Sequence, residues 1–286
     1  VREGVIRSSE PKPLPEYLQG AALVLDNETG AILAMVGGRD FLDSMYNRAL
    51  YSRRPTGTAF LPFVYATAFS TPDLFPGSLI EDAPIDNRRV MIGAITGILG
   101  EWGTEAETSW SMSTISLRES LVQSRNAATV RLGDLIGDYH IKLLPSDKRE
   151  KAVPWSVALG AIQQLTTKAG ITSPLKEYPS SFLGASEMRL DEFCRAYAAF
   201  PNGGIRAPEP YIVERIAQRD DTVIFQVDPE KRERVAAIDP VAAFQTHSCL
   251  VEALNSGTGR AARQEFGLGD FPAAGKTGTH YEFKDL

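Results

Sequence analysis

The stretch that most constrains the fold runs from Ala59 to Phe69, because it is apolar almost throughout and directly follows Gly57-Thr58. A helix that is apolar on all sides is stable only when other elements cover it. Thr58 is expected to cap its N-terminus, and Pro62 fits the first turn, where a missing N–H does no harm. The sequence therefore predicts a central buried helix with the rest of the chain folded around it.

Strand-like and helix-like segments lie in separate parts of the chain instead of alternating. This arrangement favours an α+β fold in which an antiparallel sheet is flanked by helices. The predicted strands cover residues 21–25, 31–36, 211–216, 222–227 and 271–283, the predicted helices cover 59–69, 116–136, 187–200 and 241–254, and turns are expected at 26–30 and 201–204.

Polar residues interrupt one predicted helix and mark one predicted strand. Ser124-Arg125-Asn126 is expected to break the helix over 116–136, which would place polar side chains in a cleft. Lys276-Thr277-Gly278-Thr279 falls in the strand over 271–283, where Gly275 and Gly278 permit close approach of another backbone.

Composition excludes several classes of function. The 286 residues carry a net charge of -6 with both signs dispersed, so nothing resembles a nucleic-acid-binding stripe. No apolar run approaches the roughly 18 residues needed to span a bilayer, so the chain as given is expected to be soluble. The 3 histidines lack metal-ligand spacing and no metal or cofactor is predicted, while Cys194 and Cys249 are expected to be buried free thiols.

Three motifs in a fixed order, Ser-x-x-Lys, Ser-x-Asn and Lys-Thr-Gly, mark a family of acyl-transfer sites. The second reads Ser124-Arg125-Asn126 and the third Lys276-Thr277-Gly278, but the position of the first reads Thr58-Ala59-Phe60-Leu61. Further segments match in order at 26–38, 46–49, 53–57, 62–65, 81–85 and 255–259. From about Ala21 to Thr279, the chain resembles the transpeptidase domain of class A, bifunctional penicillin-binding proteins. The resemblance implies the penicillin-binding-protein/β-lactamase-like fold with a helical subdomain.

In that family a serine attacks the penultimate D-alanine carbonyl of a peptidoglycan stem peptide and forms an acyl-enzyme, and β-lactams are trapped at the same step. The motif lysine follows by three residues, on the same helix face, and helps to deprotonate the hydroxyl. Here Thr58 stands at the nucleophile position and its extra methyl group crowds the oxygen, while Leu61 stands at the base position. A general base is worth ~10²–10⁴ in rate, so the resemblance predicts a degenerate transpeptidase.

The residues that the resemblance assigns to binding are retained. Ser124 and Asn126 would contact the substrate amide, and the segment from Lys276 to Thr279 would offer charge and hydroxyl groups to its carboxylate. The N–H groups of Thr58 and Thr279 would form the oxyanion hole. The expected role is to bind stem peptide, with weak or no β-lactam binding, as a module beside a linked glycosyltransferase or other cell-wall synthesis proteins.

Two enzymatic alternatives remain open. Thr58 could be acylated with Lys276 as its base and Ser124 in the relay, which would make the domain an active D,D-transpeptidase that binds β-lactams. A β-lactamase-like hydrolase fits less well, because the class A segments outnumber any sign of a deacylating water. Ser173-Pro174-Leu175-Lys176 also spells Ser-x-x-Lys, but it lies between prolines and is expected to be a loop.

Three further expectations concern loops and ends. Trp102, Trp110 and the acidic residues at 101, 105 and 107 would line a groove or anchor a solvated loop, and Asp82 and Asp86 are expected in turns. Residues 1–20 are predicted to be a connector ahead of a domain over 21–286. The family implies an upstream glycosyltransferase and anchor at the outer face of the cytoplasmic membrane, and it continues past Lys-Thr-Gly, where 7 residues follow Thr279 here. The remaining part would then be disordered, absent, or replaced by an exposed sheet edge.

Overall fold

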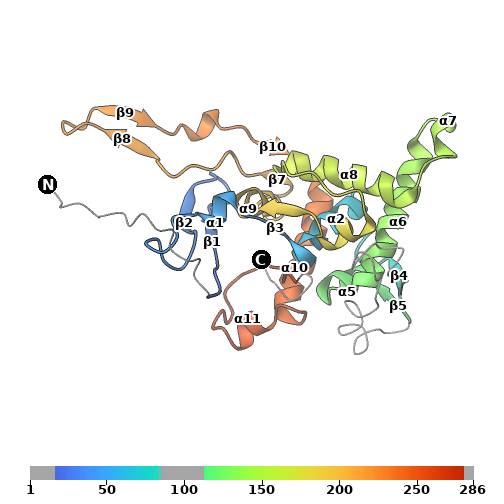
Figure 1. The fold of residues 1–286 in the computed structure, drawn as a ribbon. Coiled ribbons are helices and arrows are strands. Elements are labelled where there is room, and N and C mark those ends of the chain that lie inside the picture. The colour runs from blue at the N-terminus through green and yellow to red at the C-terminus, as the bar shows by residue number, and fades with distance from the viewer. Residues whose placement is uncertain (1–16, 84, 86–112, 280–286) are drawn as a thin grey trace, which may run out of the picture.

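A computed structural model describes residues 17–83, 85 and 113–279 of the chain (Figure 1). The helix α2 (Leu61–Phe69) lies in its interior, and each of its residues is buried. Pro62 stands in its first turn, as predicted. The expectation of a central helix buried on all sides is therefore confirmed.

Helices pack around α2, and strands occur in antiparallel pairs. The other described helices are α1 (Arg48–Tyr51), α5 (Leu117–Val122), α6 (Asn126–Leu143), α7 (Ser146–Arg149), α8 (Pro154–Ala169), α9 (Leu190–Tyr197), α10 (Pro240–Asn255) and α11 (Ala261–Gln264), with 3-10 turns η1 (Gly57–Phe60), η2 (Pro179–Leu183) and η3 (Pro229–Lys231). The strand pairs are β1 (Ala22–Leu25) with β2 (Ile32–Val36), β3 (Arg53–Pro55) with β6 (Glu187–Arg189), β4 (Leu79–Asp82) with β5 (Ser113–Ser116), β7 (Ile205–Arg206) with β10 (Val235–Ala236), and β8 (Arg215–Ala217) with β9 (Val223–Gln226).

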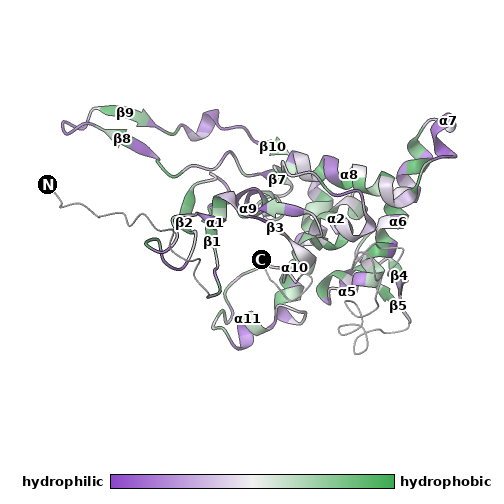
Figure 2. Ribbon diagram, viewed as in Figure 1, coloured by the Kyte–Doolittle hydropathy of each residue, from purple (hydrophilic) through white to green (hydrophobic). Residues whose placement is uncertain are grey.

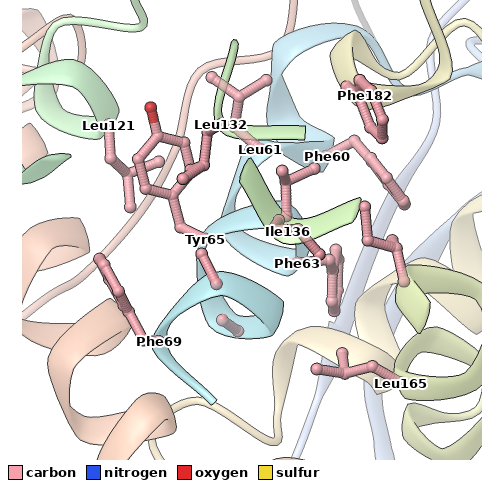
Figure 3. Close-up of a cluster of buried hydrophobic side chains, with 14 of the residues drawn as sticks. Phe60, Leu61, Phe63, Tyr65, Phe69, Leu121, Leu132, Ile136, Leu165 and Phe182 are labelled. Carbon is pink, nitrogen blue, oxygen red and sulfur yellow. The ribbon is translucent and has the colours of Figure 1, made fainter. Parts of the chain in front are cut away.

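One apolar core joins α2 to the helices on both sides of it. Figure 3 shows Leu121 from α5, Leu132 and Ile136 from α6, and Phe182 from η2 gathered around the helix. On another side Phe63 lies 5.5 Å from Tyr197 between ring centroids. Burying a large apolar side chain contributes about 1.5–3 kcal/mol, so these contacts hold α2 firmly. The 3-10 turn η1, which carries Thr58 and leads directly into α2, is thereby supported by the core.

Several other predictions are confirmed. The first hairpin forms, and Gly30 closes its loop at φ +72°. The break predicted at 124–126 forms at residues 123–125 and separates α5 from α6, the turn at 201–204 is present, and the helix predicted over 241–254 is α10. Cys194 and Cys249 are free thiols, but only Cys249 is buried as predicted, since Cys194 is partly exposed. Burial raises the pKa of Cys249 to about 11, which leaves it protonated and unreactive at neutral pH.

Other predictions are wrong in their boundaries or their kind. Residues 187–189 form strand β6, and α9 begins only at Leu190, because the Glu192 side chain accepts a hydrogen bond from Arg189 N at 2.9 Å and so organises a helix start there. The helix predicted to end at residue 136 continues to Leu143. The second hairpin is shorter than predicted, with strands at 215–217 and 223–226. Helix α8 was not predicted.

Three site-related predictions also fail. Residues 271–279 form no strand, because their backbone makes isolated hydrogen bonds to other elements and no ladder to a neighbouring strand. One of these bonds runs from Gly275 N to Leu250 O at 3.1 Å. Asp82 is buried in β4 instead of lying in a turn. Thr58 does not cap α2, because its side chain bonds elsewhere, as described below. The expectations for Asp86, for the tryptophans and acidic residues at 101–110, and for residues 1–16 of the connector lie outside the described residues.

The β8–β9 hairpin extends away from the body of the molecule (Figure 1). Its strands carry apolar residues, as the colouring of Figure 2 shows, although every residue of both strands is exposed. None of the helices in the described part of the chain combines the length and the apolar character that crossing a bilayer requires.

Candidate active site

The predicted nucleophile position lies in η1, against the Lys-Thr-Gly segment. Gly57 has φ +54°, and a Cβ atom there would lie 2.3 Å from Thr279 O, so only glycine allows the two backbones to approach so closely. The Thr58 N–H donates to Thr279 O at 3.2 Å. This contact, and not a strand pairing, docks residues 276–279 beside the start of α2.

The Thr58 side chain is 8% exposed and bonds to the same segment. Its hydroxyl donates to Thr277 O at 3.2 Å and accepts from Thr279 N at 3.3 Å. A backbone carbonyl accepts a hydrogen bond but does not take up a proton near neutral pH. The hydroxyl is therefore held in place by the backbone, which is why it does not cap α2.

Leu61, at the position of the motif lysine, is fully buried. Figure 3 shows it within the apolar cluster around α2. An unpaired ammonium group at such a place would lose its hydration at a large cost, whereas leucine adds to the core. The Leu61 side chain is therefore part of the core packing.

The break that carries Ser124 is a helix C-terminus of Schellman type. Ser124 N donates to Leu121 O at 3.2 Å and Arg125 N donates to Ser120 O at 2.8 Å, the hydrogen-bond pair that defines this motif. The left-handed position is usually glycine, yet here Ser124 adopts φ +57°. A non-glycine residue held there costs about 1–3 kcal/mol. Ser124 thus places a hydroxyl group at the break at a cost in backbone strain.

Lys276 meets that hydroxyl group. Its Nζ donates to Ser124 Oγ at 2.8 Å and to Thr277 O at 3.3 Å. The carbonyl of Thr277 thus accepts from both Lys276 and Thr58. These hydrogen bonds bring together five residues that the sequence singled out, Thr58, Ser124, Lys276, Thr277 and Thr279. Asn126, the remaining motif residue, begins α6 directly after the break.

The middle residue of the break is anchored by a buried acid. The Arg125 Nε lies 3.6 Å from Asp82 Oδ2, whose side chain is only 1% exposed. Removing one member of a buried pair leaves an uncompensated charge, so the pair ties the break to β4. The sequence offered no sign of this contact, because Asp82 and Arg125 are 43 positions apart along the chain.

Hydroxyl groups beneath the site link α2 to both sides of the break. Tyr65 Oη lies 2.6 Å from Ser120 Oγ on α5 and 3.1 Å from Thr129 Oγ1 on α6. Thr129 also donates to Arg125 O at 2.8 Å. Burial, only partly offset by these hydrogen bonds, raises the pKa of Tyr65 to about 12, so the phenol stays neutral and serves as a structural link.

Thr258 also belongs to the site, although the sequence did not predict this. Thr258 Oγ1 lies 2.9 Å from Thr277 Oγ1. The sequence marked residues 255–259 only as one of the segments that resemble the family. The available signal was a hydroxyl residue between Gly257 and Gly259, directly after the helix predicted over 241–254.

Other candidate residues lie elsewhere. Ser173 is in a loop, as predicted, and its hydroxyl bonds to Glu192 instead of to Lys176. In the part of the chain that the structure describes, no three His, Cys, Asp or Glu side chains lie together in a way that could hold a metal ion.

Comparisons with known proteins identify the family of this chain. Residues 20–285 match the family model described as the penicillin-binding protein transpeptidase domain. Penicillin-binding protein 1A of Neisseria meningitidis serogroup A is 31% identical over 274 residues, which are 94% of this chain and 30% of the relative. The Pseudomonas aeruginosa protein of the same name is 29% identical over 317 residues, 93% of this chain and 34% of the relative. The chain thus spans about a third of these relatives.

Solved structures show the same fold. Penicillin-binding protein 1A from Haemophilus influenzae superposes with a TM-score of 0.67 at 23% identity, over 91% of this chain and 40% of that one. An imipenem acyl-enzyme complex of penicillin-binding protein A from M. tuberculosis superposes with a TM-score of 0.68 at 21% identity, over 91% and 62%. The α+β fold and the resemblance to class A proteins are confirmed, and the chain belongs to the family of penicillin-binding-protein transpeptidase domains.

Proposed function

We propose that this domain serves peptidoglycan synthesis as a binding or scaffolding module that does not form an acyl-enzyme. The observation that carries the proposal is Leu61, fully buried in the core at the position of the catalytic lysine. The Thr58 hydroxyl, hydrogen-bonded to the carbonyl of Thr277, has in that carbonyl an acceptor but no base.

The retained polar groups support a binding role. Ser124 and Lys276 are joined at 2.8 Å, and the strain at Ser124 is maintained although acylation is not expected. Strain at a residue is kept only where the surroundings over-determine it, typically at a functional site. A stem peptide ending in a carboxylate matches a site built from an ammonium group and hydroxyl groups.

The wider context of the proposal comes from the relatives. Because the chain spans about a third of them, the rest of such a protein would supply a glycosyltransferase and an anchor at the outer face of the cytoplasmic membrane. This domain would then position that polymerase or hold nascent stem peptides near an active partner. Its partners would be other cell-wall synthesis proteins.

Labelling with a fluorescent penicillin, followed by intact mass, tests the proposal. We expect no penicilloyl adduct on the wild-type chain after prolonged incubation. The double change Thr58→Ser with Leu61→Lys supplies the serine and the lysine of the motif and should restore some labelling. Burial of the new ammonium group should also lower the stability of this variant, so a thermal melt checks that it is folded, and Thr58→Ser alone is the matched control that lacks the base. A stoichiometric adduct at Thr58 of the wild type would reject the proposal.

The second candidate is an active D,D-transpeptidase in which Lys276 serves as base for Thr58. It is favoured by one observation, the shared contact of the Lys276 ammonium and the Thr58 hydroxyl with Thr277 O. This candidate requires wild-type labelling that Thr58→Ala abolishes and Lys276→Ala reduces by ~10²-fold or more. Absence of labelling in the wild type rejects it.

A further inference from the structure

The loop that follows α10 is docked directly on the end of α5. Gly257 packs so closely that a Cβ atom there would lie 2.3 Å from Val122 O. The Thr258 N–H donates to the same carbonyl at 3.3 Å, and Gly259 N donates to Ala253 O at 3.0 Å. Val122 precedes Ser124 by two residues, so the loop is fixed to the segment that carries the Ser124 break.

This docking places a hydroxyl group beside the Lys-Thr-Gly segment. Thr258 Oγ1 and Thr277 Oγ1 are 2.9 Å apart, and the Thr258 side chain is exposed, so a ligand in solution can reach this part of the site. Lys276 is bound to Ser124 at 2.8 Å. The hydroxyl group of Thr277 therefore lies beside Thr258, in the loop after α10, whereas Lys276 contacts Ser124, in the break between α5 and α6.

We propose that Thr258 is a positioning residue that turns the Thr277 hydroxyl proton toward the carboxylate of a bound peptide, an inference that rests on the binding role proposed above. A hydroxyl group has one proton to donate and two acceptor sites. When Thr258 donates to Thr277 Oγ1, the proton of Thr277 is left for an anion. Each hydrogen bond in such a chain strengthens the next by polarisation.

The probes are a peptide ending in D-alanyl-D-alanine and the same peptide with a terminal carboxamide. Binding is measured by ligand-observed NMR titration to the wild type, Thr258→Val and Thr258→Ser. Valine has the shape of threonine without the hydroxyl group, whereas serine keeps the hydroxyl group. Thr222→Val, at an exposed threonine in the β8–β9 turn, is the matched control. A thermal melt of each variant checks that it is folded.

We expect Thr258→Val to weaken binding of the carboxylate peptide about tenfold, the size of one hydrogen bond to a charged group. Binding of the carboxamide peptide should change less than twofold, and Thr258→Ser should bind like the wild type. A merely structural role would weaken both peptides equally. Equal weakening of both peptides, or wild-type affinity in Thr258→Val, would overturn this inference but would leave the proposed binding function standing. Failure of the wild type to bind either peptide would instead reject the proposed binding function, and this inference with it.

Discussion

At the scale of single residues, Leu61 separates this chain from what the motif pattern of its family requires. In the motif this position holds a charged side chain that needs polar neighbours. In this chain the position holds Leu61, whose side chain is fully buried within the apolar cluster. A residue in this setting contributes through packing. Leu61 therefore contributes to the stability of the fold.

We expect Leu61→Ala to lower the free energy of unfolding by about 2–5 kcal/mol, because it leaves a cavity in the core. Leu61→Met, which nearly conserves volume, should cost less than about 1.5 kcal/mol. Urea denaturation of both variants checks the difference. Equal and small losses would show that Leu61 is not packed as the structure has it.

At the scale of elements, the helices beside the site meet at glycines. A Cβ atom on Gly137 of α6 would lie 1.9 Å from Pro154 O at the start of α8, and one on Gly133 would lie 2.2 Å from the Phe182 ring. Glycine is a poor helix former, so its presence inside α6 follows from close packing. This contact holds α6, which begins at the Ser124 break, against α8.

Two glycines in neighbouring helices therefore should respond to alanine in opposite ways. Gly137→Ala should destabilise the protein by about 1–3 kcal/mol, because the added methyl group forces the helices apart. Gly160→Ala, on the exposed side of α8 with open space around it, should stabilise by about 0.5–1 kcal/mol through helix propensity. The midpoints of thermal unfolding should shift in opposite directions, and shifts of the same sign would contradict the packing described here.

At the scale of the whole molecule, Glu192 fastens two distant segments. The carboxylate is 3% exposed and accepts from Thr172 N at 2.8 Å and from Arg189 N at 2.9 Å, besides the hydroxyl groups of Thr172 and Ser173. Burial alone would raise the pKa of Glu192, but the hydrogen bonds from Ser173, Arg189 and Thr172 outweigh it and lower the pKa from 4.5 to about 2. Global stability is thereby linked to pH.

Because the folded pKa lies below the ordinary value, this stabilisation is present above about pH 4.5 and is lost as the pH falls toward 2. The free energy of unfolding should drop by on the order of 2–3 kcal/mol over that window through this group. Glu192→Gln should be less stable at pH 7 and should lose this component of the pH dependence. Glu187→Gln, at an exposed pair with Lys176, should behave like the wild type. Chemical denaturation at several pH values measures all three, and an unchanged pH slope in Glu192→Gln would refute the link.

Local sequence determined much of the molecule. The run of apolar residues over 59–69 required a central helix, and residues 26–30 required a turn, because composition and the positions of glycine and proline decide such elements. The break at 124–126 and the order of the motifs were also readable, since these depend on residue type and spacing. The family and the fold class could therefore be predicted, whereas the roles assigned to the site residues stay predictions.

Only the tertiary structure decided which atoms meet at the site. The contact of the Thr58 hydroxyl with Thr277 O joins residues 219 positions apart, and Thr258 reaches Thr277 through a loop docked on another helix. Asp82 became a buried partner of Arg125, and residues 271–279 stayed outside any strand. Each of these outcomes depends on which neighbour the folded chain supplies, and local propensity carries no information about neighbours distant in sequence.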